Sequence, residues 1–173
     1  MAAARLLEEL PSEDALSLRA VAREVGVSAP SVYLHFEDKD AIVVEVMRRR
    51  FAALAESLDA AGAGCNDPRA ELAARSVAYC EFGARHPGAY RAMFSSVPNP
   101  RENPADLPGP AMVGVMARLI AQCGVSDGFA AATTLWCGLH GIVTLRQTKP
   151  AFPWGAQTAD IERLLEAVLS APC

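Results

Sequence analysis

Apolar positions recur three to four residues apart along most of the chain, the spacing that places side chains on one face of an α-helix. No segment shows the sustained two-residue alternation of a half-buried strand. The pattern therefore predicts an all-α protein of about nine helices. These are expected at residues 2–10, 18–24, 29–35, 39–61, 68–85, a short stretch within 86–94, 111–124, 128–147 and 159–169.

The segment at residues 95–110, SSVPNPRENPADLPGP, interrupts this helical pattern with five prolines. Proline removes a backbone donor and blocks continuation of a helix. We therefore expect a loop over the whole segment.

The stretch GVSAPSVYLHF at residues 26–36 has the features of a tight turn between two short helices. Gly26 is placed to cap the first helix in a left-handed conformation, and Ser28 to cap the second, with Pro30 in its first turn. A helix-turn-helix has this plan, and its second helix enters the DNA major groove. A helical hairpin without special function fits the spacing equally well. The small core beneath the pair is expected to contain Val21, Val25, Val27 and Val32.

The sequence of residues 17–42 closely resembles the DNA-binding domain of the TetR (tetracycline repressor) family of bacterial transcription regulators. It reads SLRAVAREVGVSAPSVYLHFEDKDAI. The GVS turn, the small residues after it, Tyr-x-His-Phe and a lysine three residues further on occur in order without gaps. The resemblance implies a three-helix DNA-binding domain at residues 1–46 and a helical ligand-binding and dimerisation domain at 47–173. The implied phosphate contacts are Ser17, Arg19, Ser28, Tyr33, His35 and Lys39, and the implied base contacts are Ala29, Pro30 and Ser31.

The C-terminal part resembles the family more weakly, in FGARHPGAYRAMF at 82–94 and in LWCGLHGIVTL at 135–145. The second stretch is similar to the Trp-x-x-x-His-Gly pattern of the WHG-type subgroup of C-terminal domains. Aromatic and methionine side chains line pockets between bundle helices, although the same residues are also common in cores. The candidate ligand contacts are Tyr79, Phe82, Tyr90, Phe94, Met112, Met116, Trp136 and His140, with a core role for His140 as the favoured alternative.

Reading DNA in this way requires two half-sites related by a two-fold axis, and therefore a homodimer. The last two helices carry an apolar stripe wider than a lone surface helix needs. The expected dimer interface consists of Leu135, Leu139, Ile142, Ile161, Leu164, Leu165 and Val168.

Charge and cysteine content limit the possible partners. The net charge is −4, and residues 1–50 contain seven Lys or Arg against nine Asp or Glu, without the basic arm that family members carry before the first helix. Affinity for DNA is therefore expected to depend on a few contacts. The five cysteines form no CxxC pair and the three histidines join no cluster, so neither a metal nor another cofactor is predicted.

The chain contains no GxGxxG, GxSxG or HExxH motif and no plausible catalytic triad, so an enzyme is not expected. It also shows neither a signal-peptide pattern at its start nor an uninterrupted apolar run of about 20 residues. We predict a cytoplasmic, ligand-released repressor that binds double-stranded DNA and a small apolar or amphipathic effector, without a membrane partner. The alternative is a protein-interaction module of the same fold that has lost specific DNA binding.

Overall fold

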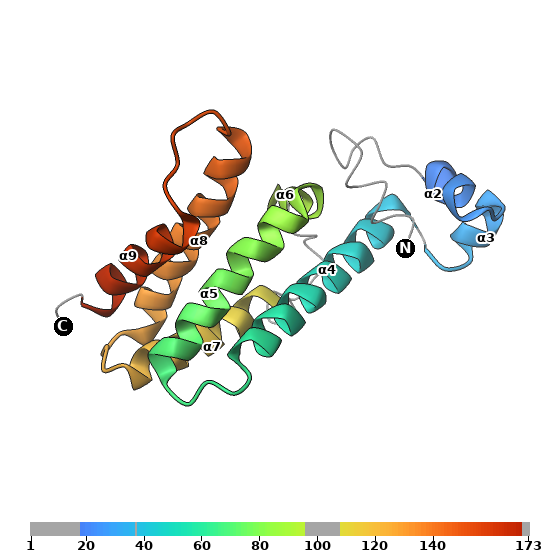
Figure 1. Ribbon diagram of the computed structural model, residues 1–173. Coiled ribbons are helices and arrows are strands. Elements are labelled where there is room, and N and C mark those ends of the chain that lie inside the picture. The colour runs from blue at the N-terminus through green and yellow to red at the C-terminus, as the bar shows by residue number, and fades with distance from the viewer. Residues whose placement is uncertain (1–17, 37, 96–107, 171–173) are drawn as a thin grey trace. The chain divides into compact units, whose positions relative to one another are not determined.

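The computed structural model describes residues 18–36, 38–95 and 108–170. The helix predicted at 2–10 and the predicted phosphate contact Ser17 lie outside these residues. Within them every regular element is helical, which confirms the all-α prediction (Figure 1). The eight helices of the described part are α2 (Leu18–Val25), α3 (Ala29–Tyr33), α4 (Lys39–Gly62), α5 (Pro68–Arg85), α6 (Pro87–Ser95), α7 (Pro108–Gln122), α8 (Gly128–Thr148) and α9 (Gln157–Leu169).

Several predicted helix boundaries differ from the structure by one to three residues, and the two described next have a clear local cause. Helix α3 ends at Tyr33 instead of residue 35, and His35 donates its backbone N–H to the Val32 carbonyl in a turn. The proline-rich segment was predicted to be a loop up to residue 110, but Pro108–Pro110 form the first turn of α7. Proline is tolerated there because the first N–H groups of a helix have no intrahelical acceptor.

The chain forms two compact units. The first takes its described residues from Met1–Ala52 and His86–Asp106, and the second from Ala53–Arg85 and Leu107–Cys173. Helix α4 contributes its beginning to the first unit and its end to the second. The predicted division lies at residues 46 and 47, whereas the units divide α4 at residues 52 and 53, and α6 groups with the first unit.

The first unit has a small core under α2, α3 and the start of α4. Its buried apolar side chains there are Ala22, Val32, Ile42 and Val46. Val27 was predicted to join this core, but it is 47% exposed, because it lies in the turn after Gly26. The side chains of Val21 and Val25 lie outside the described part.

Three aromatic rings join α4 and α6 within the first unit. The Phe94 ring lies edge-on to Phe51 at 5.6 Å between centroids and is tilted against Tyr90 at 4.7 Å. Edge-to-face aromatic pairs stabilise a contact beyond the area that they bury. Helix α6 is thereby fixed to the α4 segment before Ala52.

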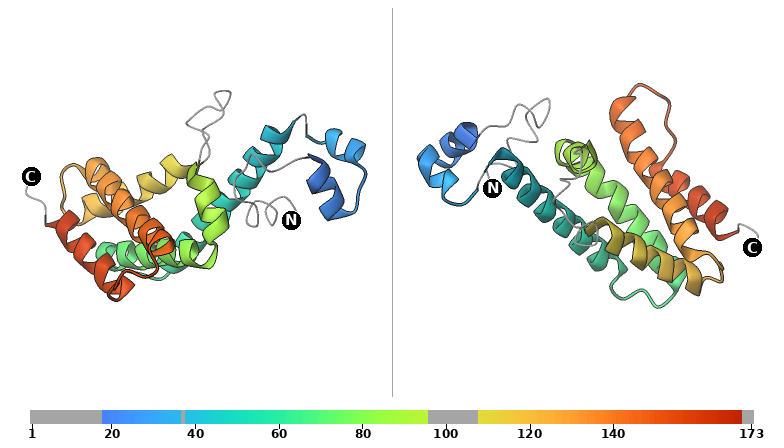
Figure 2. Two further views of the ribbon diagram at one scale, coloured as in Figure 1. Left: turned by 90° about the horizontal axis from the view of Figure 1, so that it is seen from above. Right: turned by 180° about the vertical axis from the view of Figure 1, so that it is seen from behind.

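The second unit is a helical bundle in which α8 packs against α5, α7 and α9 (Figure 2). Two glycines permit close helix contacts. A Cβ on Gly128 would lie 2.5 Å from the Ala117 carbonyl oxygen of α7, and one on Gly138 would overlap a Leu164 methyl group of α9. In the described part α8 is also the one helix that is long and apolar enough to cross a membrane by length and composition. Here it packs against three helices of the bundle.

The connection between α8 and α9 folds around Arg146. Its guanidinium donates to the Gly155 carbonyl at 2.8 Å and to the Asp160 carboxylate at 2.5 Å, and it lies 5.3 Å from the centre of the Trp154 ring. The Trp154 indole N–H in turn donates to the Lys149 carbonyl at 2.9 Å. Further along the bundle, the Gln147 amide donates to the Gly83 carbonyl at 2.9 Å and joins α8 to α5.

Candidate nucleic-acid interface and bundle pocket

The turn between α2 and α3 is built by a left-handed glycine. Gly26 has a φ of 72°, and its N–H donates to the Arg23 carbonyl at 3.3 Å. The Val27 N–H reaches back to the Ala22 carbonyl at 3.0 Å. This pair of bonds is a Schellman motif, which satisfies the last carbonyls of a helix and reverses the chain sharply. The predicted left-handed cap at Gly26 is confirmed.

Helix α3 begins directly after this turn, with Ser28 as its cap. The Ser28 backbone is extended, and its Oγ accepts the Ser31 N–H at 3.3 Å while lying 2.7 Å from the Ser31 hydroxyl oxygen. Pro30 occupies the second helical position. Asp38 then caps α4 by accepting the Ala41 N–H at 2.8 Å. Side-chain caps therefore define where α3 and α4 begin, and the backbone N–H of Leu34 closes the end of the five-residue α3.

The structure leaves most of the described candidate DNA contacts accessible. Arg19, Ser28, Pro30 and His35 are exposed, and Ser31 is half-buried. Ala29 and Tyr33 belong to α3 and Lys39 opens α4, but their side chains lie outside the described part.

Sequence reasoning missed one apolar residue beside this surface. Leu34 follows α3 and is 84% exposed, the most exposed of the large hydrophobic side chains in the described part. The signal in the sequence was its position between Tyr33 and His35, outside the three-to-four-residue spacing that leads to buried Val32.

The arginines of α4 at positions 48 and 49 are not isolated charges. Arg48 donates from Nε to Glu45 at 2.8 Å, and Arg49 forms an ion pair with the same carboxylate. The hydrogen bonds from Arg48 and then Arg49 lower the pKa of Glu45 to about 2. Part of the positive charge at this point of α4 is therefore neutralised within the helix.

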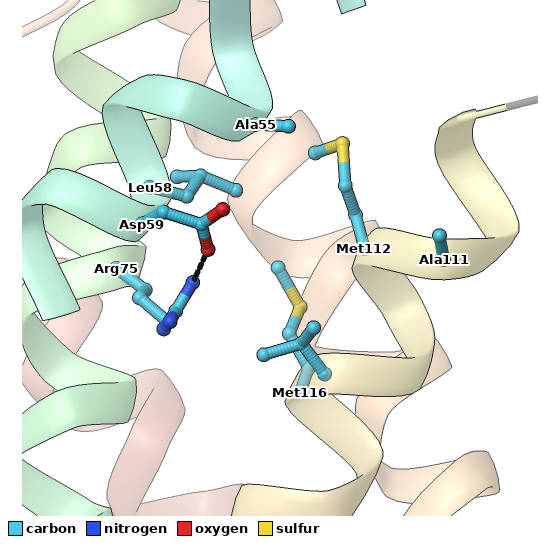
Figure 3. A pocket seen from close by; sticks show the side chains of 8 residues that line it. Ala55, Leu58, Asp59, Arg75, Ala111, Met112 and Met116 are labelled. Atoms are coloured by element: carbon cyan, nitrogen blue, oxygen red, sulfur yellow. Dashed lines mark hydrogen bonds and ion pairs between the residues drawn. The ribbon is translucent and has the colours of Figure 1, made fainter. Parts of the chain in front are cut away.

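The second unit contains a pocket of about 190 Å³ among α4, α5 and α7 (Figure 3). Its single polar wall is an ion pair, in which Arg75 of α5 donates from Nη1 to the Asp59 carboxylate of α4 at 2.8 Å. The rest of the lining is apolar. It consists of Ala55, Leu58, Ala111, Met112, Val115 and Met116.

Of the predicted ligand contacts, Met112 and Met116 line this pocket. Tyr79 and Phe82 are buried in the bundle core, and the Tyr79 hydroxyl accepts the indole N–H of half-buried Trp136 at 3.0 Å. Tyr90 and Phe94 belong to the aromatic contact of the first unit and are not among the lining residues.

His140 is half-buried in α8 and is also absent from the pocket lining. Burial lowers the pKa of its imidazole, because a charged ring is poorly solvated there. A lowered pKa favours the neutral imidazole.

Sequence reasoning missed the two charged residues of the pocket. Arg75 occupies the stripe of α5 that also carries the buried Leu72 and Tyr79. A basic residue on a buried stripe is unusual unless it is paired. That position was the available signal for a polar site, whereas Asp59 falls on an exposed part of α4 and gave none.

The predicted dimer stripe is largely used within one chain. Leu135, Leu139, Ile161, Leu165 and Val168 are at most 5% exposed. The other two are half-buried, and Leu164 covers Gly138 while Ile142 lies on α8. The five buried residues pack within one chain, because α8 and α9 bury their stripes against each other and against α5 and α7.

In the described part of the chain, cysteines and histidines join no cluster that could hold a metal ion. Cys80 is buried in the bundle, and burial raises the pKa of its thiol to about 12. A thiol in this state is a poor nucleophile and metal ligand. Cys137, in contrast, is exposed on α8.

Comparisons with protein families match two parts of the chain. Residues 2–46 match "bacterial regulatory proteins, tetR family", and residues 72–171 match "tetracyclin repressor-like, C-terminal domain". Both are families of regulators and not of enzymes, in agreement with the prediction from the sequence. A relative, the uncharacterized HTH-type transcriptional regulator Rv0681 of Mycobacterium tuberculosis, is 30% identical over 140 residues, or 78% of this chain. The chain spans 62% of that protein's length.

Solved structures share the fold over almost the whole chain. A protein with unknown function from Rhodococcus sp. RHA1 superposes with a TM-score of 0.80 at 23% identity, covering 97% of this chain and 92% of its own. SCO4454, a TetR-family transcriptional regulator from Streptomyces coelicolor, gives a TM-score of 0.76 at 20% identity, with 97% and 84% covered.

Proposed function

Because the chain belongs to the TetR family of bacterial regulatory proteins, we propose that it binds a palindromic DNA operator as a homodimer and represses transcription until a small ligand releases it. The observation that carries this proposal is the turn between α2 and α3. Gly26 and Ser28 hold α3 with Ser28, Pro30 and the following His35 accessible to a partner. A short exposed helix after a sharp turn fits the major groove.

The chemistry of α3 indicates how the operator is read. Its accessible side chains are small or apolar, with Pro30 and the neighbouring Leu34 exposed and the hydroxyl of Ser31 half-buried. Such groups contact thymine methyl groups and phosphates, and they lack the long arms of bidentate guanine contacts. We therefore expect specificity to depend on van der Waals contact and DNA shape.

We propose that the homodimer uses the outer side of α8, since the buried stripe is not available to a second chain. Side chains on this side are small or apolar, so another helix could approach closely. They include Ala130, Thr134, Cys137 and Leu145, all exposed, and a Cβ on the neighbouring Gly141 would meet open space. Two recognition helices related by this dimer should lie about 34 Å apart, or a multiple of that distance.

Release is proposed to act through α4. This helix begins at Lys39 beside the reading turn, and its later residues Ala55 and Asp59 line the bundle pocket. A ligand that binds one conformation of α4 more tightly than the other shifts the population toward that conformation. If the preferred conformation is the one that binds DNA poorly, the ligand lowers operator affinity, and the size of its preference limits the size of the decrease.

The first test is a selection of bound duplexes from a random pool, followed by affinity measurements on the selected operator. Lys39→Ala should weaken binding uniformly across sequences and reduce the salt slope of log K by about 1, as the loss of one phosphate contact requires. Lys149→Ala is the matched control, because Lys149 is the other lysine of the chain and lies exposed after α8.

Tyr33→Ala should also weaken operator binding while leaving the melting temperature nearly unchanged. Unchanged affinity of both Tyr33→Ala and Lys39→Ala would contradict the proposed interface.

A protein-interaction module remains the second candidate, because acidic residues outnumber basic ones in residues 1–50. Absence of salt-dependent binding to any duplex in the same selection would favour it.

A further inference from the structure

The bundle pocket contains one ion pair within otherwise apolar walls. Figure 3 shows Met112 and Met116 reaching from α7 toward α4, while Asp59 and Arg75 meet on one side of the space. Methionine adapts its shape to irregular apolar ligands. A volume of about 190 Å³ is below the roughly 300–1,000 Å³ of pockets that bind drug-sized ligands. The occupant is therefore small, mostly apolar, and polar at one end.

Arg75 is the fixed member of the ion pair. Its side chain is 12% exposed, and its Nε donates to Glu71 one helical turn earlier at 2.8 Å. It also lies directly against the end of α4, because a Cβ on Gly62 would come within 2.7 Å of Nε. A guanidinium has five N–H donors, and the bonds to Glu71 and Asp59 occupy two of them. Arg75 therefore has donors left for a further acceptor.

Asp59 is the replaceable member. Its side chain is 71% exposed, so it can rotate into water and remain solvated. Exposed ion pairs contribute little to stability, and losing this one should change an equilibrium by about fivefold or less. An anionic ligand could thus take the place of the Asp59 carboxylate at small cost.

We infer that this pocket selects a small amphipathic anion, whose carboxylate binds Arg75 in place of Asp59 and whose apolar tail packs against Met112 and Met116. The inference rests on the proposed function, in which this pocket holds the effector. Arg75 favours a planar acceptor because its fork of donors matches a carboxylate with two parallel bonds. A cationic head would instead have to share Asp59 with a guanidinium 2.8 Å away.

Three probes with one tail and different heads test the inference on the full chain: 4-phenylbutyrate, 4-phenylbutan-1-ol and 4-phenylbutylamine. Their binding is measured by calorimetry in the absence of DNA. A hydrogen-bonded charge pair in a partly buried site should make the acid bind about tenfold or more tightly than the alcohol. The amine should bind more weakly than either. Preference for the amine, equal affinity of all three, or no binding would overturn the inference.

Asp59→Asn distinguishes a pocket that selects an anion from one that selects a cation. Asp59 is exposed, so the substitution should leave the fold intact. Removing the competing carboxylate should tighten binding of the acid by up to about fivefold. If the pocket instead selects a cation, the same variant should abolish binding of the amine, and a weaker affinity for the acid would contradict our inference. Glu56→Gln is the matched control, because Glu56 is an exposed carboxylate on α4 outside the pocket.

Two further variants test Arg75 itself. Arg75→Gln should make the affinities for the acid and the alcohol equal. Gly62→Ala should reduce the same preference, because the added methyl group would lie 2.7 Å from Arg75 Nε and displace the guanidinium without a backbone collision. Melting temperatures show whether each variant folds, and Gly62→Ala and Asp59→Asn keep the test decisive if Arg75→Gln does not fold.

Operator binding is measured separately, by fluorescence anisotropy of the selected duplex. Selection of the acid without any duplex binding would refute the proposed regulator but support the pocket chemistry. Duplex binding without a preference for the acid would support the proposed regulator and refute the inferred pocket chemistry.

Discussion

The tripeptide Gly-Val-Ser connects two helices twice in this chain, at residues 26–28 and at 124–126. We call these the first and the second junction. Gly26 and Gly124 both adopt left-handed conformations, with φ values of 72° and 94°. In both junctions the valine N–H reaches back to close the preceding helix, from Val27 to Ala22 at 3.0 Å and from Val125 to Ile120 at 3.4 Å. The two junctions therefore have the same backbone conformation and hydrogen-bond pattern.

The two junctions differ in the helix that each turn leads into. Helix α3 after the first has five residues and accessible side chains, with Ser28 as its cap. Helix α8 after the second has 21 residues, with Asp127 as its cap and Gly128 pressed against the α7 backbone. A turn of this kind only sets the angle between helices. Whether the second helix faces a partner or a core depends on its length and its apolar residues.

The largest expected effect breaks the second junction. Gly128→Ala places a methyl group 2.5 Å from the Ala117 carbonyl oxygen, a backbone atom that cannot rotate away. Overpacking of this kind should lower the free energy of unfolding by about 3 kcal/mol. Gly114→Ala is the control, since nothing lies near its added Cβ within α7, and it should be neutral or stabilising by up to about 1 kcal/mol. Urea unfolding measures both, and equal stabilities would contradict the close α7–α8 contact.

A smaller effect separates the two junctions from each other. Gly26→Ala and Gly124→Ala each force an alanine into a left-handed conformation, at a cost of about 1–2 kcal/mol. We expect Gly124→Ala to lower the unfolding midpoint of the bundle with little change in operator affinity. Gly26→Ala should weaken the operator complex and leave the bundle transition in place. The same loss of DNA binding in both variants would show that the junctions are not functionally distinct.

The smallest expected effect depends on pH and concerns the helix after the second junction. Because burial lowers the pKa of His140, the unfolded chain takes up a proton at a higher pH than the folded chain. The free energy of unfolding should therefore fall slightly as the pH drops below about 6.5, the ordinary histidine value. His140→Asn should flatten this slope between pH 7.5 and 5.5, and His35→Asn, at an exposed position, is the control. A slope that survives His140→Asn would assign the effect to other groups.

Local features of the fold could be predicted from the sequence because their causes are local. The glycine cap at Gly26 and the serine cap at Ser28 need only neighbouring backbone groups. The helix predicted at residues 68–85 has those bounds in the structure, since Asp67 precedes it and His86 is the first residue outside.

Longer-range features could not be predicted in the same way. The stripe with Leu135 and Leu165 has the same spacing whether it faces the same chain or a second copy, so the sequence alone could not choose. The pocket was missed for a related reason: Asp59 and Arg75 are 16 residues apart, and only the packing of α4 on α5 brings them together. Large aromatic residues such as Tyr79 were predicted to contact a ligand, but Tyr79 is buried in the core of the bundle.

The contacts of Trp136 and Trp154 have an optical consequence. These are the two tryptophans of the chain, and both belong to the second unit. One indole is bonded to Tyr79 within the bundle, and the other stacks near Arg146 at the end of α8. Intrinsic emission excited at the red edge of tryptophan absorption therefore contains no signal from the first unit. If adding operator changes that emission, DNA binding at α2 and α3 has altered the structure around a tryptophan of the second unit, and no added label is needed to detect it.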